Sequence, residues 1–186
     1  MPAGLEIERK YLLSGAPSDA ELADLGAQPH RIEQVYLRSE GDWVRRIRKI
    51  DAAGRTRYVA TRKREIAGIT REEHEEELDA AAYDRILRAD ADPARRAVRK
   101  VRHAFPFAGH VLELDVFIEP PGLVLLEVEL EDASELPALP PVIQALLVRE
   151  VSLESAYMNH EIALRPPPPA ELALDGERRG GARSTS

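Results

Sequence analysis

Leu5-Glu6-Ile7-Glu8-Arg9-Lys10-Tyr11 places charged side chains at alternate positions close to the beginning of the chain. In an extended strand, successive side chains point to opposite faces. Glu6, Glu8 and Lys10 therefore share one face, whereas Leu5, Ile7 and Tyr11 lie largely on the other. This stretch predicts a β-strand with one face of ionisable groups and one mostly apolar face.

Later strands repeat the pattern. Between Val111 and Phe117, aliphatic side chains alternate with Glu113 and Asp115, and residues 126–131 alternate three aliphatics with three glutamates. Like charges two positions apart on one face repel each other, so charges of opposite sign are expected between them. Other predicted strands carry pairs of basic residues in this arrangement: Arg46 with Arg48, and Lys100 with Arg102.

The cost of burying charge leaves two interpretations of the ionisable face. Removing one charge from water costs several kcal/mol, whereas a whole domain is stable by only about 5–15 kcal/mol. A dry core lined by so many charges would not fold. The face is therefore either an ordinary solvated surface, which each strand taken alone would favour, or the wall of a wet cavity for charged ligands. Clustered carboxylates suit Mg²⁺ or Mn²⁺, and several lysines and arginines suit a phosphate chain.

The composition narrows the class of protein. The chain has 186 residues, of which 44% are hydrophobic and 32% charged, and a formal net charge of -7. This predicts one substantial soluble domain and argues against general nucleic-acid binding through a basic surface. With no cysteine there is no disulfide and no thiolate chemistry. Neither a secretory signal nor a membrane span is apparent, so a cytoplasmic enzyme or binding protein is expected.

Alternation and turn signals predict eight strands with helices at intervals, which together form one α+β domain over residues 1–165. Ser18 and Glu21 form a capping box at the start of a short helix. Asp79 caps a second helix, Pro140-Pro141 opens a third, and residues 153–164 form the last. Residues 166–186, rich in Pro and Gly, are expected to be a disordered tail. The strands are predicted at residues 5–13, 31–39, 43–50, 56–64, 70–78, 97–105, 110–118 and 123–131.

The order of the charged motifs resembles that of the CYTH domain, or triphosphate tunnel metalloenzyme, family. The resemblance extends from Leu5 to about Leu164 and is closest to the small bacterial inorganic triphosphatases. It implies an eight-stranded antiparallel β-barrel with a hydrophilic tunnel as its lumen and helices packed outside. The motifs are Glu6-x-Glu8-x-Lys10, Arg46-x-Arg48, Thr61-x-Lys63, Arg71-x-Glu73-x-Glu75, Lys100-x-Arg102, Glu113-x-Asp115 and Glu127-x-Glu129.

The resemblance also implies roles for individual residues. Glu73, Glu77, Glu113 and Arg71 are expected to neutralise neighbouring charges, and Asn159 to help close one tunnel mouth. The basic residues expected to bind substrate and to act in catalysis are Lys10, Arg46, Arg48, Lys63, Lys100 and Arg102. The expected ligands of Mg²⁺ or Mn²⁺ are Glu6, Glu8, Glu127 and Glu129, with Asp115 and Glu75 as candidates for a second ion or for orienting water.

Family members act on triphosphate substrates with a divalent metal, and the predicted activity is hydrolysis of inorganic tripolyphosphate by metal-activated water. A class IV adenylyl cyclase, a thiamine triphosphatase and a non-catalytic module that binds polyphosphate or nucleotides remain alternatives. The expected partner is a small triphosphate, with no nucleic acid or membrane, and the chain is expected to be a monomer or a homodimer.

Overall fold

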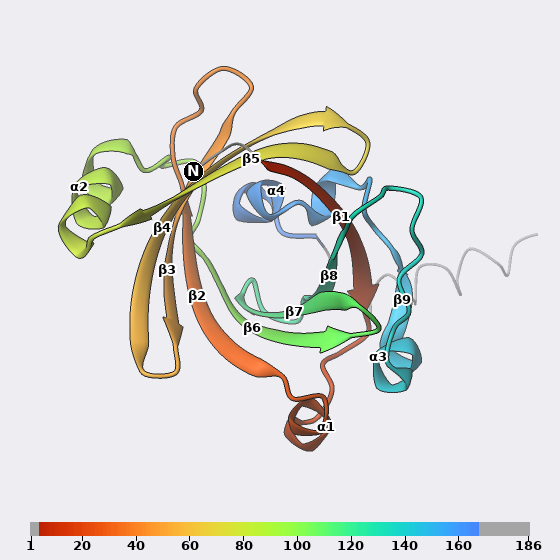
Figure 1. Cartoon of the computed structure of the whole chain (residues 1–186). Helices are drawn as coiled ribbons and strands as arrows, with labels where there is room; N and C mark the ends of the chain where they lie inside the picture. The colour runs from red at the N-terminus through yellow and green to blue at the C-terminus, as the bar shows by residue number, and fades with distance from the viewer. Residues whose placement is uncertain (1–3, 168–186) are drawn as a thin grey trace, which may run out of the picture.

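Eight antiparallel strands close into a barrel in the computed structural model, which describes residues 4–167 (Figure 1). Closure occurs at β1, whose first residues pair with β5 and whose remaining residues pair with β8. Going round the barrel, the order is β1-β5-β4-β3-β2-β6-β7-β8. The strands are β1 (Gly4–Leu13), β2 (Gln28–Tyr36), β3 (Val44–Ala52), β4 (Arg55–Ala67), β5 (Thr70–Leu78), β6 (Val98–Phe107), β7 (His110–Glu119) and β8 (Val124–Leu130).

The helices are short, and all but the last lie outside the ring of strands (Figure 1). They are α1 (Asp19–Asp24), α2 (Ala80–Asp90), α3 (Pro141–Leu146) and α4 (Asn159–Leu164). The predicted capping box is confirmed, since the Ser18 side chain accepts a hydrogen bond from the Glu21 backbone and Glu21 accepts one from the Ser18 backbone. None of the described helices is long and apolar enough to cross a membrane.

The C-terminal segment differs most from the prediction. In place of one helix over residues 153–164, the structure has a 3-10 turn, η1 (Ser155–Tyr157), followed by α4. Met158 between them is extended (φ -75°, ψ 132°). This break allows the side chains of both Tyr157 and Asn159 to be buried. A further strand, β9 (Leu147–Glu150), pairs with the end of β1 and was not predicted.

Two further predictions need correction. The strand expected at residues 31–39 is shifted toward the N-terminus, because β2 ends at Tyr36 and Leu37 forms an isolated bridge to Ala91. The predicted tail at residues 166–186 lies almost entirely outside the described residues.

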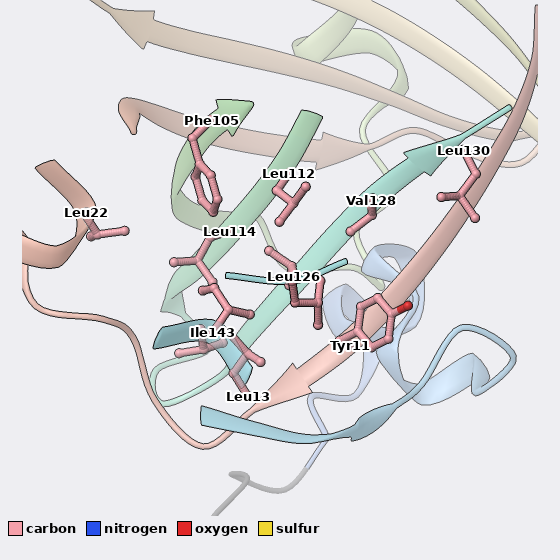
Figure 2. Close-up of a cluster of buried hydrophobic side chains, with 12 residues drawn as sticks. Tyr11, Leu13, Leu22, Phe105, Leu112, Leu114, Leu126, Val128, Leu130 and Ile143 are labelled. Carbon is pink, nitrogen blue, oxygen red and sulfur yellow. The ribbon is translucent and has the colours of Figure 1, made fainter. Parts of the chain in front are cut away.

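Outside the barrel, the apolar side chains of the strands pack under α1 and α3. Leu112, Leu114, Leu126 and Val128 point outward from β7 and β8 and are buried in a cluster that includes Leu22 of α1 (Figure 2). Ile143 of α3 completes the same cluster. On another side, α2 covers the barrel with Tyr83, which packs with Leu37 and Ile47.

The lumen is closed by apolar side chains in the region where α4 packs. Leu12, Phe117 and Leu125 point inward from three strands and contact Tyr157 of η1 and Ile162 of α4. Seen along the barrel, α4 lies within the ring of strands (Figure 1). The ionisable side chains of the same strand faces therefore line only the remaining part of the lumen.

Candidate functional site

A cavity of about 540 Å³ occupies the lumen. It lies beside the apolar cluster of Leu12, Phe117, Leu125, Tyr157 and Ile162, here called the apolar seal. Its lining includes ionisable side chains from β1, β3, β4, β5, β6, β7 and β8, and residues of the C-terminal segment. Of the predicted site residues, all but Lys100 and Asp115 line it. The lining members are Glu6, Glu8, Lys10, Arg46, Arg48, Lys63, Glu75, Arg102, Glu127 and Glu129. The ionisable strand faces thus converge on one cavity, which rules out the interpretation as an ordinary outer surface.

Strand register decides which charges meet. Lys10 on β1 lies directly opposite Glu127 on β8, and Lys63 on β4 lies opposite Glu73 on β5. Pairs of like charges along one strand are thereby neutralised from the neighbouring strands.

Glu127 is at the centre of the strongest ion cluster. Its carboxylate accepts from the Lys10 ammonium at 2.8 Å and from the Arg102 guanidinium at 2.5 Å. Burial by itself would raise the pKa of Glu127, but Lys10 and Arg102 outweigh it and hold this pKa well below the usual range. Glu127 is therefore ionised at every pH near neutrality, and it fixes two cations at the cavity wall.

Lys100 and Asp115 lie behind this wall. Arg102 donates to Asp115 twice, from Nε at 2.7 Å and from Nη2 at 2.8 Å, and the Lys100 ammonium contacts the same carboxylate. Asp115 is fully buried. Burial also lowers the pKa of Lys100 to about 8 despite the attraction of Asp115. Both residues are placed to orient Arg102 from the side away from the cavity.

Lys63 is shared by two glutamates. Its ammonium donates to the two carboxylate oxygens of Glu6 at 2.8 and 2.6 Å and lies 3.1 Å from Glu73. Arg46 lies 3.8 Å from Glu73. Burial, reinforced by repulsion from Glu6, raises the pKa of Glu73 to about 7, although Lys63 and Arg46 oppose the shift.

Arg46 and Arg48 bring two guanidinium groups to the same wall. The Nε of each is buried and has no hydrogen-bond partner among residues 4–167. Burial, followed by the repulsion of Arg46, lowers the pKa of Arg48 to about 10. Since buried donors are nearly always satisfied, these two groups have unused capacity for an anion.

Glu8 and Glu129 carry negative charge that the neighbouring cations do not fully balance. They lie directly opposite each other on β1 and β8. Burial, with repulsion from Glu127, raises the pKa of Glu8, and burial with repulsion from Glu6 raises that of Glu129. Glu129 has no ion-pair partner within 4 Å in the described part of the chain, and Glu8 shares Lys10 with Glu127.

This pair of carboxylates fits a divalent cation. No three acidic or histidine side chains of residues 4–167 gather into a complete metal cage. Mg²⁺, however, is commonly held by one or two carboxylates together with waters and substrate phosphates. Two facing carboxylates, of which Glu8 shares one ammonium with Glu127 and Glu129 has no ion-pair partner among residues 4–167, lie beside cations with unused donors and match that pattern.

Several cavity residues were not among the predicted substrate-binding residues or metal ligands. Tyr36 lines the cavity, and its hydroxyl accepts a hydrogen bond from Gln34. The inward parity of β2 could have indicated this pair. Asn159 donates to Glu127 at 3.4 Å and accepts from Lys100 at 3.5 Å. Arg71, for which only a neutralising role was expected, also lines the cavity.

The comparisons with known proteins agree with this architecture. Residues 4–157 match the model of the CYTH domain. The chain belongs to the CYTH domain family. The CYTH match covers all eight barrel strands and ends at Tyr157, the aromatic residue of the apolar seal. No curated protein sequence matches the chain significantly.

Among solved structures, the inorganic triphosphatase NE1496 is 28% identical to this CYTH protein, with a TM-score of 0.55, covering 88% of this chain and 100% of that one. Two others are similar in fold. The PH1819 protein from Pyrococcus horikoshii OT3 is 20% identical (TM-score 0.52, 69% and 80% covered). A putative adenylyl cyclase from Hippeastrum, described as having a dominant triphosphatase activity, is 21% identical (TM-score 0.51, 68% and 80% covered).

Proposed function

We propose that this CYTH protein is a divalent-metal-dependent triphosphatase that hydrolyses inorganic tripolyphosphate. The observation that carries the proposal is the unbalanced charge of the cavity. Arg46 and Arg48 keep buried donors without partners, while Glu8 and Glu129 face each other with a single ammonium within 4 Å among residues 4–167, that of Lys10, which Glu8 shares with Glu127. A metal–polyphosphate complex satisfies both sets at once. The likeness to the inorganic triphosphatase NE1496 supports the choice of substrate.

In this proposal the basic residues bind and orient the phosphate chain. Arg46, Arg48 and Lys63 contact phosphate oxygens from β3 and β4, and Lys10 and Arg102 contact them from β1 and β6. Their positive charge stabilises the negative charge that develops on the phosphate oxygens in the transition state. Lys100 and Asp115 act indirectly by fixing Arg102.

Glu8 and Glu129 would hold the metal, and Glu6 is less available because Lys63 already engages both of its oxygens. A bound Mg²⁺ or Mn²⁺ would neutralise phosphate charge and lower the pKa of the attacking water. Glu127 is less available as a ligand because Lys10 and Arg102 already engage both of its oxygens. Glu75, which contacts Arg48 and Thr61, is proposed to orient Arg48.

Phosphate release from tripolyphosphate, ATP, thiamine triphosphate and pyrophosphate tests the substrate. With Mg²⁺ or Mn²⁺, tripolyphosphate should be the best substrate by kcat/KM, and a chelator should abolish turnover. Higher activity on thiamine triphosphate or ATP would overturn the choice of substrate. Formation of cyclic AMP and pyrophosphate from ATP would identify a cyclase, and tight binding without turnover would identify a binding module.

Glu8→Gln should raise the metal concentration that gives half-maximal activity by roughly 10- to 100-fold, as for groups that support bound metals. It should also raise the free energy of unfolding in chelator. Burial raises the pKa of Glu8, so its ionised form destabilises the fold at neutral pH. Metal titration and urea unfolding measure the two effects. Glu76→Gln, at an exposed position, is the control; an unchanged metal requirement in Glu8→Gln would exclude Glu8 as a ligand.

Glu73→Gln should lower the KM for tripolyphosphate, but only at alkaline pH. With its pKa at about 7, Glu73 is ionised above this pH and competes with phosphate for Lys63 and Arg46. At about pH 8.5 the KM of the variant should be about threefold below that of the wild type, as for a modest ion pair. At about pH 6, where Glu73 is mostly protonated, the two should coincide. A ratio of KM values that does not change with pH would contradict this role.

A further inference from the structure

Arg71 differs from the other basic residues of the cavity in having no carboxylate partner. It lies on β5 with the same parity as Glu73 and Glu75, and it lines the cavity. Each of the other lysines and arginines of the lining has an acidic group within 4 Å; Arg71 has none among residues 4–167. Its contact is with the thioether of Met158, where Nη2 lies 3.1 Å from Sδ. A thioether is only a weak acceptor.

The missing partner matters for binding. Lys63 and Arg102 each hold two or more carboxylates, so a phosphate must compete with these glutamates and aspartates before it can use them fully. Arg71 can donate to an anion without breaking an ion pair. Its planar guanidinium also suits a phosphoryl group, to which it can donate two parallel hydrogen bonds.

The position of Arg71 is distinct from that of the arginines on β3. The register of β3, β4 and β5 places Arg46 level with Glu75 and Arg48 level with Glu77, four and six residues along β5 from Arg71. Arg71 lies instead beside the C-terminal segment, where its guanidinium contacts Met158. Its backbone lies opposite Glu6 on β1 and Glu65 on β4. The cavity therefore has two sets of cations that are separated along the strands, Arg71 at one level and the arginines of β3 at another, which suits an elongated anion.

We propose that Arg71, held by Met158 of the C-terminal segment, binds one end of the phosphate chain and makes the site prefer a triphosphate over a diphosphate. This inference rests on the proposed function and deepens it. A chain of three phosphoryl groups reaches both sets of cations, whereas pyrophosphate is satisfied by one. Met158 holds the guanidinium without neutralising its charge. An aspartate or glutamate at this position would neutralise that charge.

Calorimetric titration of the full chain with tripolyphosphate and pyrophosphate tests the proposal first in chelator, where the proposed metal-dependent turnover does not occur, and is then repeated with Mg²⁺. Arg71→Met should weaken tripolyphosphate binding by roughly 10- to 100-fold, which corresponds to the loss of one hydrogen-bonded charge contact. Pyrophosphate binding should change by less than about threefold. Arg71→Lys should recover part of the loss, since it retains the charge without the planar fork.

The matched control is Arg62→Met. Arg62 is an exposed arginine on β4, and its guanidinium stacks over Trp43 at 4.9 Å on the outward side of the strand. This variant should bind both ligands as the wild type does. If Arg71→Met weakened the binding of both ligands equally, or of neither, the role of Arg71 would be overturned and the triphosphatase proposal would stand. Failure of the wild type to bind tripolyphosphate would overturn both.

Discussion

Lys63→Ala should reduce kcat/KM for tripolyphosphate by roughly 10²–10³-fold, the loss expected when one transition-state donor is removed. Lys63 is the inward-facing cation of β4, and it holds Glu6 and Glu73 together. Without it, two neighbouring glutamates face each other and repel the substrate as well. Steady-state phosphate release measures the effect.

The double variant Lys63→Ala/Glu73→Gln separates catalysis from stability. Removing the charge of Glu73 relieves part of the repulsion that the lost lysine leaves behind, so the free energy of unfolding should recover partly toward the wild-type value. Activity should remain low, because the cation is still absent. If the double variant regained full activity, Lys63 would be only a neutralising group and its assignment to substrate would be wrong.

Asp115→Asn should lower the free energy of unfolding by about 3–5 kcal/mol, the cost of breaking a buried ion pair by removing one partner. Asp115 is fully buried, and it holds Arg102 in a bidentate contact and Lys100 from the other side. The substitution leaves Lys100 with no carboxylate within 4 Å among residues 4–167 and Arg102 with only Glu113 and Glu127. Urea unfolding at neutral pH, in chelator, measures the loss.

Glu113→Gln provides the matched control. Glu113 contacts the same Arg102, but its side chain is 36% exposed, so this substitution should cost less than about 1 kcal/mol. The sequence had indicated Asp115 as a possible ligand of a second metal. If Asp115→Asn retained wild-type stability but required more metal for activity, the ligand role would be supported over the structural one.

Most of the barrel was predictable because its strands alternate strictly. An inward charge at every second position, as in residues 5–11, can be tolerated only where the charges meet water and each other. This requirement left a solvated surface or a wet cavity, and the family resemblance favoured the cavity. The structure places Glu6, Glu8 and Lys10 on its wall. Turn signals and the capping box at Ser18 located the hairpins and α1 to within a few residues.

The C-terminal segment was less predictable. Residues 153–164 show a helical apolar spacing, but the chain breaks at Met158 so that Tyr157 and Ile162 both reach the apolar seal of the lumen. The four residues of β9 are too few to show alternation, and they become a strand only because the end of β1 offers a free edge there. Both features depend on contacts with distant strands.

By itself, then, the sequence determined which side chains share one face of each strand, since the two-residue period of a strand is a local property of the backbone. It could not determine how deeply each of them lies or which partner it meets. Register and barrel closure placed Asp115 and Lys100 behind Arg102, set Glu8 against Glu129, and left Arg71 without a carboxylate partner among residues 4–167. These differences arise because burial and ion pairing are set by neighbours on other strands, which only the tertiary structure brings together.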